Sequence, residues 1–265
     1  MQELPRCQRI RVNRCPVQAA RPQRSPAILG VTGDHGESEM KVTEVLVKVF
    51  EPGRLQMAWQ QVRKNAGAAG IDQMTVEEFA HREEPLLALI HDKLKSGNYR
   101  FQPARRVLIP KEGTSGVRKL GIPVVMDRIV GVSMHSVLEE HFDPDFTASN
   151  FGFRRGRSQQ QAIRHLQRLV NEGREWAVAI DLKSFFDEIP HGLILQLIRR
   201  KVADEQFVNL IARLLKAGVI VKGEFEKTTK GCPQGSPLSP ILSNIVLNEL
   251  DHKLEEKPGV LSLGR

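Results

Sequence analysis

The chain has 265 residues and a mass of 29.8 kDa, a length that allows one large domain or two smaller ones. Hydrophobic residues make up 40% and charged residues 26%, which suits an ordinary soluble core. No segment approaches the roughly 18 consecutive apolar residues of a membrane span, so we expect no integral membrane protein. Three scattered cysteines exclude a disulfide scaffold and a four-ligand zinc site, and the start lacks an apolar signal segment, which favours a reducing, cytoplasmic location.

The positive charge is concentrated in three parts of the chain. The formal net charge is +8, and basic side chains far outnumber acidic ones in residues 1–25, 100–128 and 151–175. Such clusters indicate a polyanionic partner such as a nucleic acid. Three solvated basic surfaces without a partner remain an equally good interpretation of charge alone.

The N-terminal part changes character at Met40. Residues 1–40 mix Arg, Pro, Gly and Ser without apolar periodicity, which predicts a disordered basic tail. Beyond it, helical spacing of apolar residues predicts two helices separated by Pro52-Gly53. Thr75 and Glu78 have capping-box spacing and predict a helix that continues through Ile90.

The rest of the chain mixes short strands with helices. Residues 107–109 and 117–122 predict two strands around a turn at 113–116, and residues 219–225 predict a hairpin that turns at Gly223. Residues 176–180 predict a short buried strand that ends on Asp181. Helices are expected from Ile129 onward, over 160–170, over 207–215 and from Ser239. Without regular βαβ alternation, these elements predict an α+β fold.

Asp181 is the first candidate for chemistry. A carboxylate at a strand end, with a backbone carbonyl beside it, suits a hard cation such as Mg²⁺. An Asp in this position is, however, more commonly a cap or a turn former. The motif alone therefore leaves the metal site and the turn open.

The loop from Lys230 to Pro240 is the second candidate. Gly235 allows the backbone to approach a ligand closely, Gln234 offers a donor and an acceptor to a nucleotide, and the loop leads into a helix start. The alternative is a plain loop followed by a helix cap.

Two basic segments complete the set of candidates. Lys111 and Arg118 flank a tight turn, an arrangement that suits a triphosphate, although a solvated hairpin tip explains it as well. The segment from Phe151 to Ser158 interleaves aromatic residues with Arg154, Arg155 and Arg157, which favours base stacking together with phosphate contact.

Taken together and in this order, these segments resemble the bacterial group II intron reverse transcriptase/maturase family over about residues 45–256. The motifs that carry the resemblance are Ala58 to Val62, Gly70 to Thr75, Arg106 to Lys111, Arg118 to Pro123, Asp127 to Val130, Gly152 to Ser158, Asp181 to Asp187 and Pro233-Gln-Gly235. Lys119, Gly131 and Arg155 depart from the family pattern. The resemblance implies a right-hand polymerase fold with fingers and an incomplete palm. The implied organisation is a tail (1–40), an N-terminal extension with fingers (41–175) and a truncated palm (176–265).

The resemblance also implies residue roles. Asp181 corresponds to the first catalytic, metal-binding aspartate, with Leu182 contributing its carbonyl. Phe186 corresponds to the side chain that excludes a ribose 2′-hydroxyl, and Gln234 with Gly235 to the loop that lines the incoming nucleotide. Lys111 and Arg118 correspond to the triphosphate ligands. The arginines expected to bind RNA are Arg105, Arg106, Arg128, Arg154, Arg155 and Arg157.

The implied activity is RNA-directed DNA synthesis with two Mg²⁺ ions. Its partners would be intron RNA, an RNA template with a DNA primer, and dNTPs, in a bacterial cytoplasm without a membrane role; a homodimer stays open. The family's aromatic-Ala-Asp-Asp turn is missing, and the chain contains no Asp-Asp pair. We therefore expect these 265 residues alone not to polymerise DNA. The alternative is a non-catalytic remnant that binds intron RNA.

Overall fold

The structure is a computed structural model that describes residues 7–14, 41–110, 113, 117–174, 176–233 and 235–256, with backbone only for 7–14. Contacts divide the chain into two units. The larger unit contains Lys41–Phe146 and Ser184–Leu250, and the described part of the smaller unit contains 7–14, 147–174, 176–183 and 251–256. These limits differ from the predicted boundary at residue 175, because residues 184–250 pack with the preceding helices rather than with residues 176–183.

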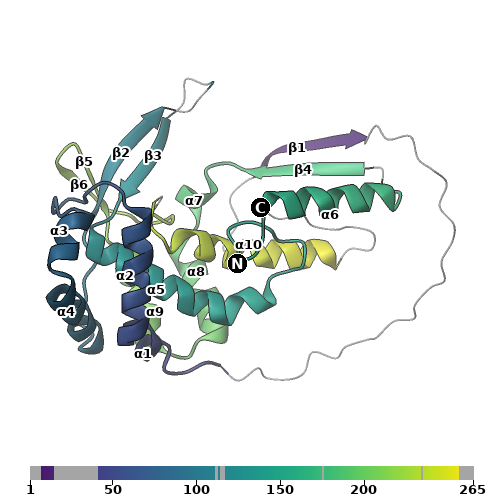
Figure 1. The fold of residues 1–265 in the computed structure, drawn as a ribbon. Helices are drawn as coiled ribbons and strands as arrows, with labels where there is room; N and C mark the ends of the chain where they lie inside the picture. The colour runs from purple at the N-terminus through teal and green to yellow at the C-terminus, as the bar shows by residue number, and fades with distance from the viewer. Residues whose placement is uncertain are drawn as a thin grey trace. The chain divides into compact units, whose positions relative to one another are not determined.

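The larger unit is mainly helical (Figure 1). Its helices are α1 (Val45–Phe50), α2 (Pro52–Asn65), α3 (Val76–His81), α4 (Glu83–Lys95), α5 (Val125–Phe142), α7 (Phe185–Glu188), α8 (His191–Lys201), α9 (Glu205–Leu215) and most of α10 (Ser239–Glu255), with a 3₁₀ turn, η1, at Asp143–Asp145. Helices α1, α2 and α4 pack against the long α5. The core includes Trp59 and Phe79, whose ring centroids lie 4.5 Å apart.

The helix boundaries follow local sequence signals. Pro52 begins α2, where its missing N–H costs no hydrogen bond. The predicted capping box is confirmed: the Glu78 N–H donates to the Thr75 hydroxyl at 3.1 Å, and the Thr75 N–H donates to the Glu78 carboxylate at 2.8 Å. The helix expected to run on through Ile90 is instead two helices, because Arg82 leaves the helical conformation at φ −127°.

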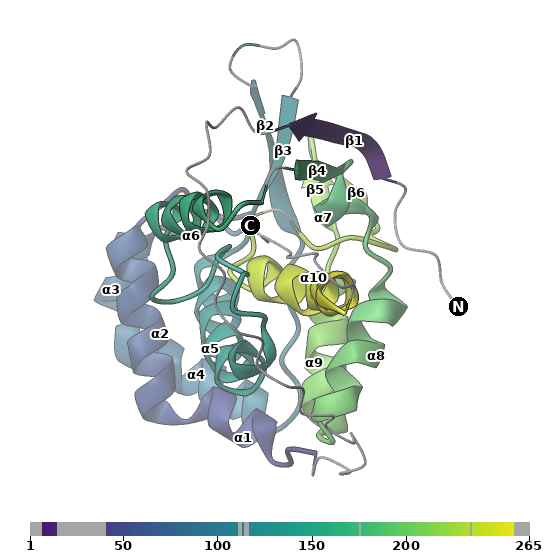
Figure 2. The ribbon, with the colours of Figure 1, turned by 90° about the vertical axis from the view of Figure 1, so that its right-hand side faces the viewer.

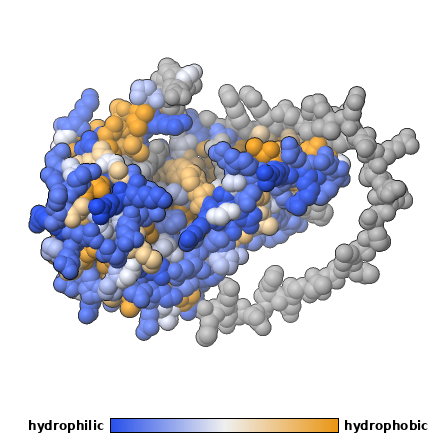
Figure 3. All heavy atoms as spheres, in the orientation of Figure 1, coloured by the Kyte–Doolittle hydropathy of each residue, from blue (hydrophilic) through white to orange (hydrophobic). Residues whose placement is uncertain are grey.

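A four-stranded sheet completes the larger unit. Its strands are β2 (Ala104–Pro110), β3 (Val117–Ile122), β5 (Val219–Val221) and β6 (Glu224–Glu226), in the order β3-β2-β5-β6. Both predicted hairpins are confirmed: β2 pairs antiparallel with β3, and β5 with β6 around Gly223. The β2–β3 hairpin exposes apolar side chains, visible as apolar surface in Figure 3, from Leu108, Ile109 and Val117.

The smaller unit contains a two-stranded antiparallel sheet and one helix. The sheet pairs β1 (Cys7–Arg14) with β4 (Trp176–Leu182), and the helix is α6 (Gln159–Asn171). The predicted disordered tail is therefore wrong for residues 7–14, which supply backbone partners for one edge of β4. The expected burial of this strand is also wrong: Trp176 is 64% exposed, since a sheet of two strands covers little of its own surface.

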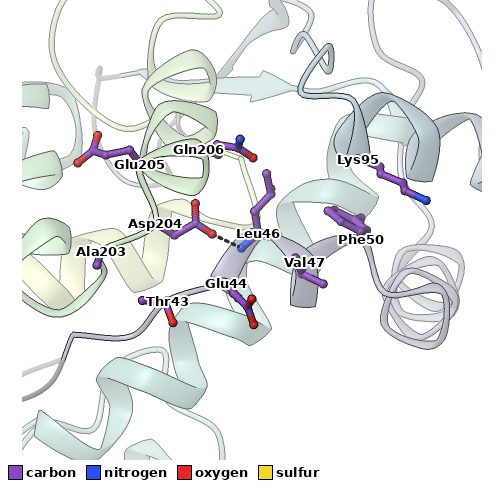
Figure 4. A pocket seen from close by; sticks show the side chains of 10 residues that line it. All are labelled: Thr43, Glu44, Leu46, Val47, Phe50, Lys95, Ala203, Asp204, Glu205 and Gln206. Carbon is purple, nitrogen blue, oxygen red and sulfur yellow. Dashed lines mark hydrogen bonds between the residues drawn. The ribbon is translucent and has the colours of Figure 1, made fainter.

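A surface cavity of about 490 Å³ lies between α1 and the start of α9 in the larger unit (Figure 4). Asp204 lies at its edge and uses both carboxylate oxygens. Oδ2 accepts from the Leu46 N–H at 2.8 Å, and Oδ1 accepts from the Phe207 N–H at 3.0 Å. Asp204 thus caps α9 and holds α1 against it.

In the part of the chain that the structure describes, no helix has the length and apolar character needed to cross a membrane.

Asp127 fastens the start of α5 to the segment before β2. Its side chain is buried, accepting from the Tyr99 hydroxyl at 2.7 Å and from the Gln102 N–H at 2.8 Å. Burial raises the pKa of Asp127 to about 7, although both hydrogen bonds favour the carboxylate. Burial also raises the pKa of Tyr99, with a further contribution from the neighbouring Asp127, so the phenol remains a donor.

The free energy of unfolding is expected to depend on pH through Asp127. The folded state keeps its proton up to about pH 7, whereas an unfolded Asp loses it near pH 4, so the contribution is greatest below about pH 4 and is lost as the pH rises to about 7. Asp127→Asn should flatten this slope in urea titrations between pH 4 and 8. The matched variant Asp92→Asn, at an exposed position on α4, should keep it. An unchanged slope in Asp127→Asn would contradict the assignment.

Candidate nucleotide-binding site

The loop formed by residues 230–239, here called the glycine loop, is attached to the α7–α8 segment in the larger unit. The Gly231 N–H donates to the Ile189 carbonyl at 2.7 Å, and the Cys232 N–H donates to the Phe186 carbonyl at 2.7 Å. The His191 Nε2 lies 2.9 Å from the Gly231 carbonyl oxygen. A carbonyl only accepts, so Nε2 carries the proton and donates. The carbonyl and amide groups of Gly231 are thus both held.

Two glycines allow the loop to pass between α7 and β3. Gly231 has φ +83°, and a Cβ there would lie 2.7 Å from the Asp187 carbonyl oxygen. Gly235 has φ +102°, and a Cβ there would overlap the Gly121 carbonyl on β3. Neither position accepts a side chain without moving the backbone.

The end of the loop is fixed to the start of α10. The Ser239 hydroxyl donates to the Pro233 carbonyl at 2.7 Å, and the Ser236 N–H donates to the same oxygen at 3.0 Å. The Pro237 ring lies over Gly131 of α5, at a distance of 3.4 Å from where a Cβ would stand. A Cβ on Gly131 would make an ordinary van der Waals contact at this distance, so Pro237 does not explain why Gly131 departs from the family pattern.

The structure brings together some of the predicted nucleotide-binding residues. Phe186 is half-buried, its ring edge-on to Phe185 with centroids 6.1 Å apart, and its carbonyl accepts from the glycine loop. Gly235 lies against β3, the strand that carries the exposed Arg118 opposite Ile109. Lys111 and Gln234 lie outside the described residues.

Asp181 belongs to the smaller unit. It is exposed and lies inside β4 rather than after it, with Leu182 half-buried at the end of the strand. Within the described residues, no three His, Cys, Asp or Glu side chains gather closely enough to hold a metal ion. Asp181 and the Leu182 carbonyl therefore do not amount to a site for two divalent ions.

Two of the six arginines expected to bind RNA are used inside the protein. Arg105 donates from Nε and Nη2 to the Ala69 carbonyl, at 3.1 and 2.7 Å. Arg128 donates to the Pro123 carbonyl at 2.9 Å and to the Ala68 carbonyl. Arg105 thereby holds the segment before Gly70 against β2, and Arg128 holds it against the start of α5. Burial lowers the pKa of Arg128 from its usual value. Sequence reasoning missed this structural role, since Ala69 and Ala68 lie 36 and 60 positions from the two arginines.

Of the other four arginines, Arg155 and Arg157 are exposed, whereas Arg106 and Arg154 are half-buried. Arg154 donates to the Thr147 and Asn150 carbonyls at 2.9 and 3.1 Å, and Arg157 lies over the Phe151 ring, 5.3 Å from its centroid. Arg155 is exposed. Half-buried Arg106, on β2, has an Nε without a hydrogen-bond partner among the described residues.

The sequence model of the family described as reverse transcriptase (RNA-dependent DNA polymerase) matches residues 109–263. The chain belongs to the reverse transcriptase family. The match includes the β2–β3 turn, β4 and the glycine loop, and it confirms the fold implied by the motifs. Reverse transcriptases use divalent metal ions.

Named relatives confirm the group II intron reverse transcriptase/maturase branch. The chain is 36% identical over 220 residues to the group II intron-encoded protein LtrA of Lactococcus lactis subsp. cremoris, covering 81% of this chain and 36% of that protein. It is 35% identical over 227 residues to protein YkfC of Escherichia coli strain K12, covering 83% of this chain and 59% of that protein. The chain thus spans between about a third and three fifths of these two relatives.

A solved structure has the same fold. The chain matches a protein of a partial Cas6-RT-Cas1--Cas2 complex with a TM-score of 0.51 and 24% identity, covering 80% of this chain and 35% of that one. This likeness supports the reverse transcriptase fold and nothing finer.

Alanine at either loop glycine should destabilise the larger unit. Gly231→Ala and Gly235→Ala combine backbone strain with a clash, which we expect to lower the free energy of unfolding by about 1–3 kcal/mol more than strain alone. Gly223→Ala is the matched control, because Gly223 has φ +91° but open space around its Cβ position. Urea denaturation of the three variants measures the difference. Equal losses in all three would show that the close approaches do not restrict the loop.

Proposed function

We propose that this chain supplies the fingers and part of the palm of a group II intron-type RNA-directed DNA polymerase/maturase. The observation that carries the proposal is the attachment of the glycine loop to Phe186 on one side and to β3 on the other. Residues that are far apart in the chain, and that the family resemblance assigns to one nucleotide, thereby meet in one unit. Its partners would be an RNA template with a DNA primer, intron RNA and dNTPs.

Each binding residue has a separate task in this proposal. Phe186 excludes a ribose 2′-hydroxyl by occupying its space. Gln234 and Gly235 border the base and sugar, with Gly235 keeping the backbone close. Lys111 and Arg118 neutralise the triphosphate, since multidentate positive groups bind phosphate oxygens strongly.

Polymerisation needs more carboxylates than this chain supplies. Two Mg²⁺ ions would be required in the complete enzyme, to activate the primer 3′-hydroxyl and stabilise the leaving pyrophosphate. The chain offers Asp181 and the Leu182 carbonyl but no Asp-Asp pair, and the residues that the structure describes hold no group of three metal-ligating side chains, so these described residues do not fit two ions. We therefore propose that these 265 residues bind substrates without extending a primer.

The proposal is tested by mixing the chain with an RNA template–DNA primer duplex and a photoreactive dNTP. We expect the dNTP to cross-link within residues 186–235 and to be preferred over the matching rNTP, with the preference reduced in Phe186→Ala. No primer extension is expected with Mg²⁺. Salt-sensitive binding of intron RNA without nucleotide cross-linking would instead support the non-catalytic remnant. Primer extension by the original chain that is lost in Asp181→Asn would overturn the proposed inactivity.

Exposed arginines should contribute to RNA affinity through phosphate contacts. Arg155→Ala is expected to weaken binding at low salt and to reduce the slope of log affinity against log salt by about 1, the value for one phosphate contact. Arg200→Ala is the control, since Arg200 is also exposed but pairs with Glu249 on α10. Fluorescence anisotropy at several salt concentrations measures both. Identical slopes for the two variants would remove Arg155 from the interface.

A further inference from the structure

We propose that His191 is a positioning residue that fixes the glycine loop for nucleotide binding by holding the Gly231 carbonyl. The effect of His191 on nucleotide binding rests on the proposed function, whereas its effect on the loop follows from the hydrogen-bond geometry alone. His191 has no role in the motif assignments above. It lies at the first position of α8, five residues after Phe186, and is 8% exposed.

Both backbone polar groups of Gly231, its N–H and its carbonyl, are hydrogen-bonded to residues of the α7–α8 junction. Its N–H donates to the Ile189 carbonyl at 2.7 Å, and its carbonyl accepts from His191 Nε2 at 2.9 Å. Pro190, between these two partners, forms an isolated antiparallel bridge with Lys230. The α7–α8 junction and the start of the loop therefore pair like two short strands, and the His191 side chain adds a hydrogen bond to this pairing.

Among the described residues, the His191 imidazole gives this arrangement a buried side-chain hydrogen bond. The nearby Lys230–Glu188 ion pair, at 2.6 Å, lies between side chains that are 55% and 43% exposed, so solvent screens it. Burial lowers the pKa of His191 from its usual value, which keeps the ring neutral with one N–H to donate. Removing the ring leaves the Gly231 carbonyl unpaired in a buried position.

The lost hydrogen bond would act on the nucleotide-binding residues through the backbone. Gly231 is followed by Cys232, whose N–H donates to the Phe186 carbonyl, and then by Pro233, Gln234 and Gly235. Without the His191 hydrogen bond, the start of the loop keeps only the backbone hydrogen bonds from Gly231 to Ile189 and from Cys232 to Phe186. The approach of Gly235 to Gly121 is then enforced less firmly from this end than from the far end, near Ser239.

Cys232 provides a direct measure of this release. Its side chain is 3% exposed, and burial raises the pKa of its thiol to about 12, so it reacts slowly while the loop is closed. Alkylation of Cys232, located by mass mapping to distinguish it from Cys7 and Cys15, reports the fraction of open loop.

The experiment compares three variants of the full chain. His191→Ala removes the donor, while His191→Gln places an amide N–H near the Nε2 position and should restore it. His141→Ala is the matched control, because His141 is half-buried and its Nε2 has no hydrogen-bond partner among the described residues. Alkylation of Cys232 and hydrogen exchange at Gly231 and Cys232 are measured well below the unfolding transition, with the α5 amides as the internal reference.

We expect both rates to rise about tenfold to a hundredfold in His191→Ala, the range for one unpaired buried acceptor, with α5 unchanged. His191→Gln and His141→Ala should stay close to the original chain. Unchanged rates in His191→Ala, or rates in His191→Gln as fast as in His191→Ala, would overturn the positioning role.

A second arm separates this inference from the proposed function. His191→Ala should weaken dNTP cross-linking by a factor similar to the loop opening and leave primer–template affinity unchanged, with recovery in His191→Gln. A loosened loop with undiminished cross-linking would overturn the nucleotide part of the inference. If the original chain cross-links no dNTP at all, the proposed function fails, and the exchange rates still decide whether His191 holds the loop.

Discussion

The larger unit depends on a backbone path that only glycine can follow. Gly231 passes within 2.8 Å of the Phe186 carbonyl, measured from the position where a Cβ would stand, and Gly235 lies against the Gly121 carbonyl. These two approaches fix one loop to α7 on one side and to the β2–β3 hairpin on the other (Figure 2). Because the same loop begins α10, a displacement at either glycine would move a helix as well as the candidate nucleotide site.

Charged and polar groups do much of the fastening around this loop. Asp127 joins Tyr99 to the Gln102 amide, and Arg105 and Arg128 hold the segment before Gly70. A buried polar atom without a hydrogen bond is costly, and each of these side chains pairs with such an atom. Truncating any of the three side chains would therefore leave its partner unpaired. The arginines of the basic segments are therefore of two kinds: some complete the fold, and others, such as Arg155, are exposed.

Local patterns predicted most of the secondary structure but not its burial. The capping box at Thr75 and the turn at Gly223 depend on residues within a few positions, so their sequence signals were sufficient. The pairing of β1 with β4 joins residues about 170 positions apart, and His191 meets Gly231 across 40 positions. Sequence patterns do not reveal such distant contacts, so the predicted burial of β4 is wrong and His191 is not among the site residues that the motifs indicate. The roles assigned to the site residues, Phe186, Gly235 and Arg118 as well as Lys111, Gln234 and Asp181, remain predictions from the resemblance.

Substrate binding and catalysis place different demands on this chain. Binding depends on shape and positive charge, and in the proposed function the glycine loop, Phe186 and exposed Arg118 supply both without any metal. Two-metal chemistry depends on several carboxylates at one point, and the chain offers Asp181 without an Asp-Asp pair. The glycine loop is held by contacts within the larger unit, to Phe186 and to β3, and none of these contacts involves Asp181. The proposed nucleotide binding can therefore be tested separately from nucleotide transfer in these 265 residues.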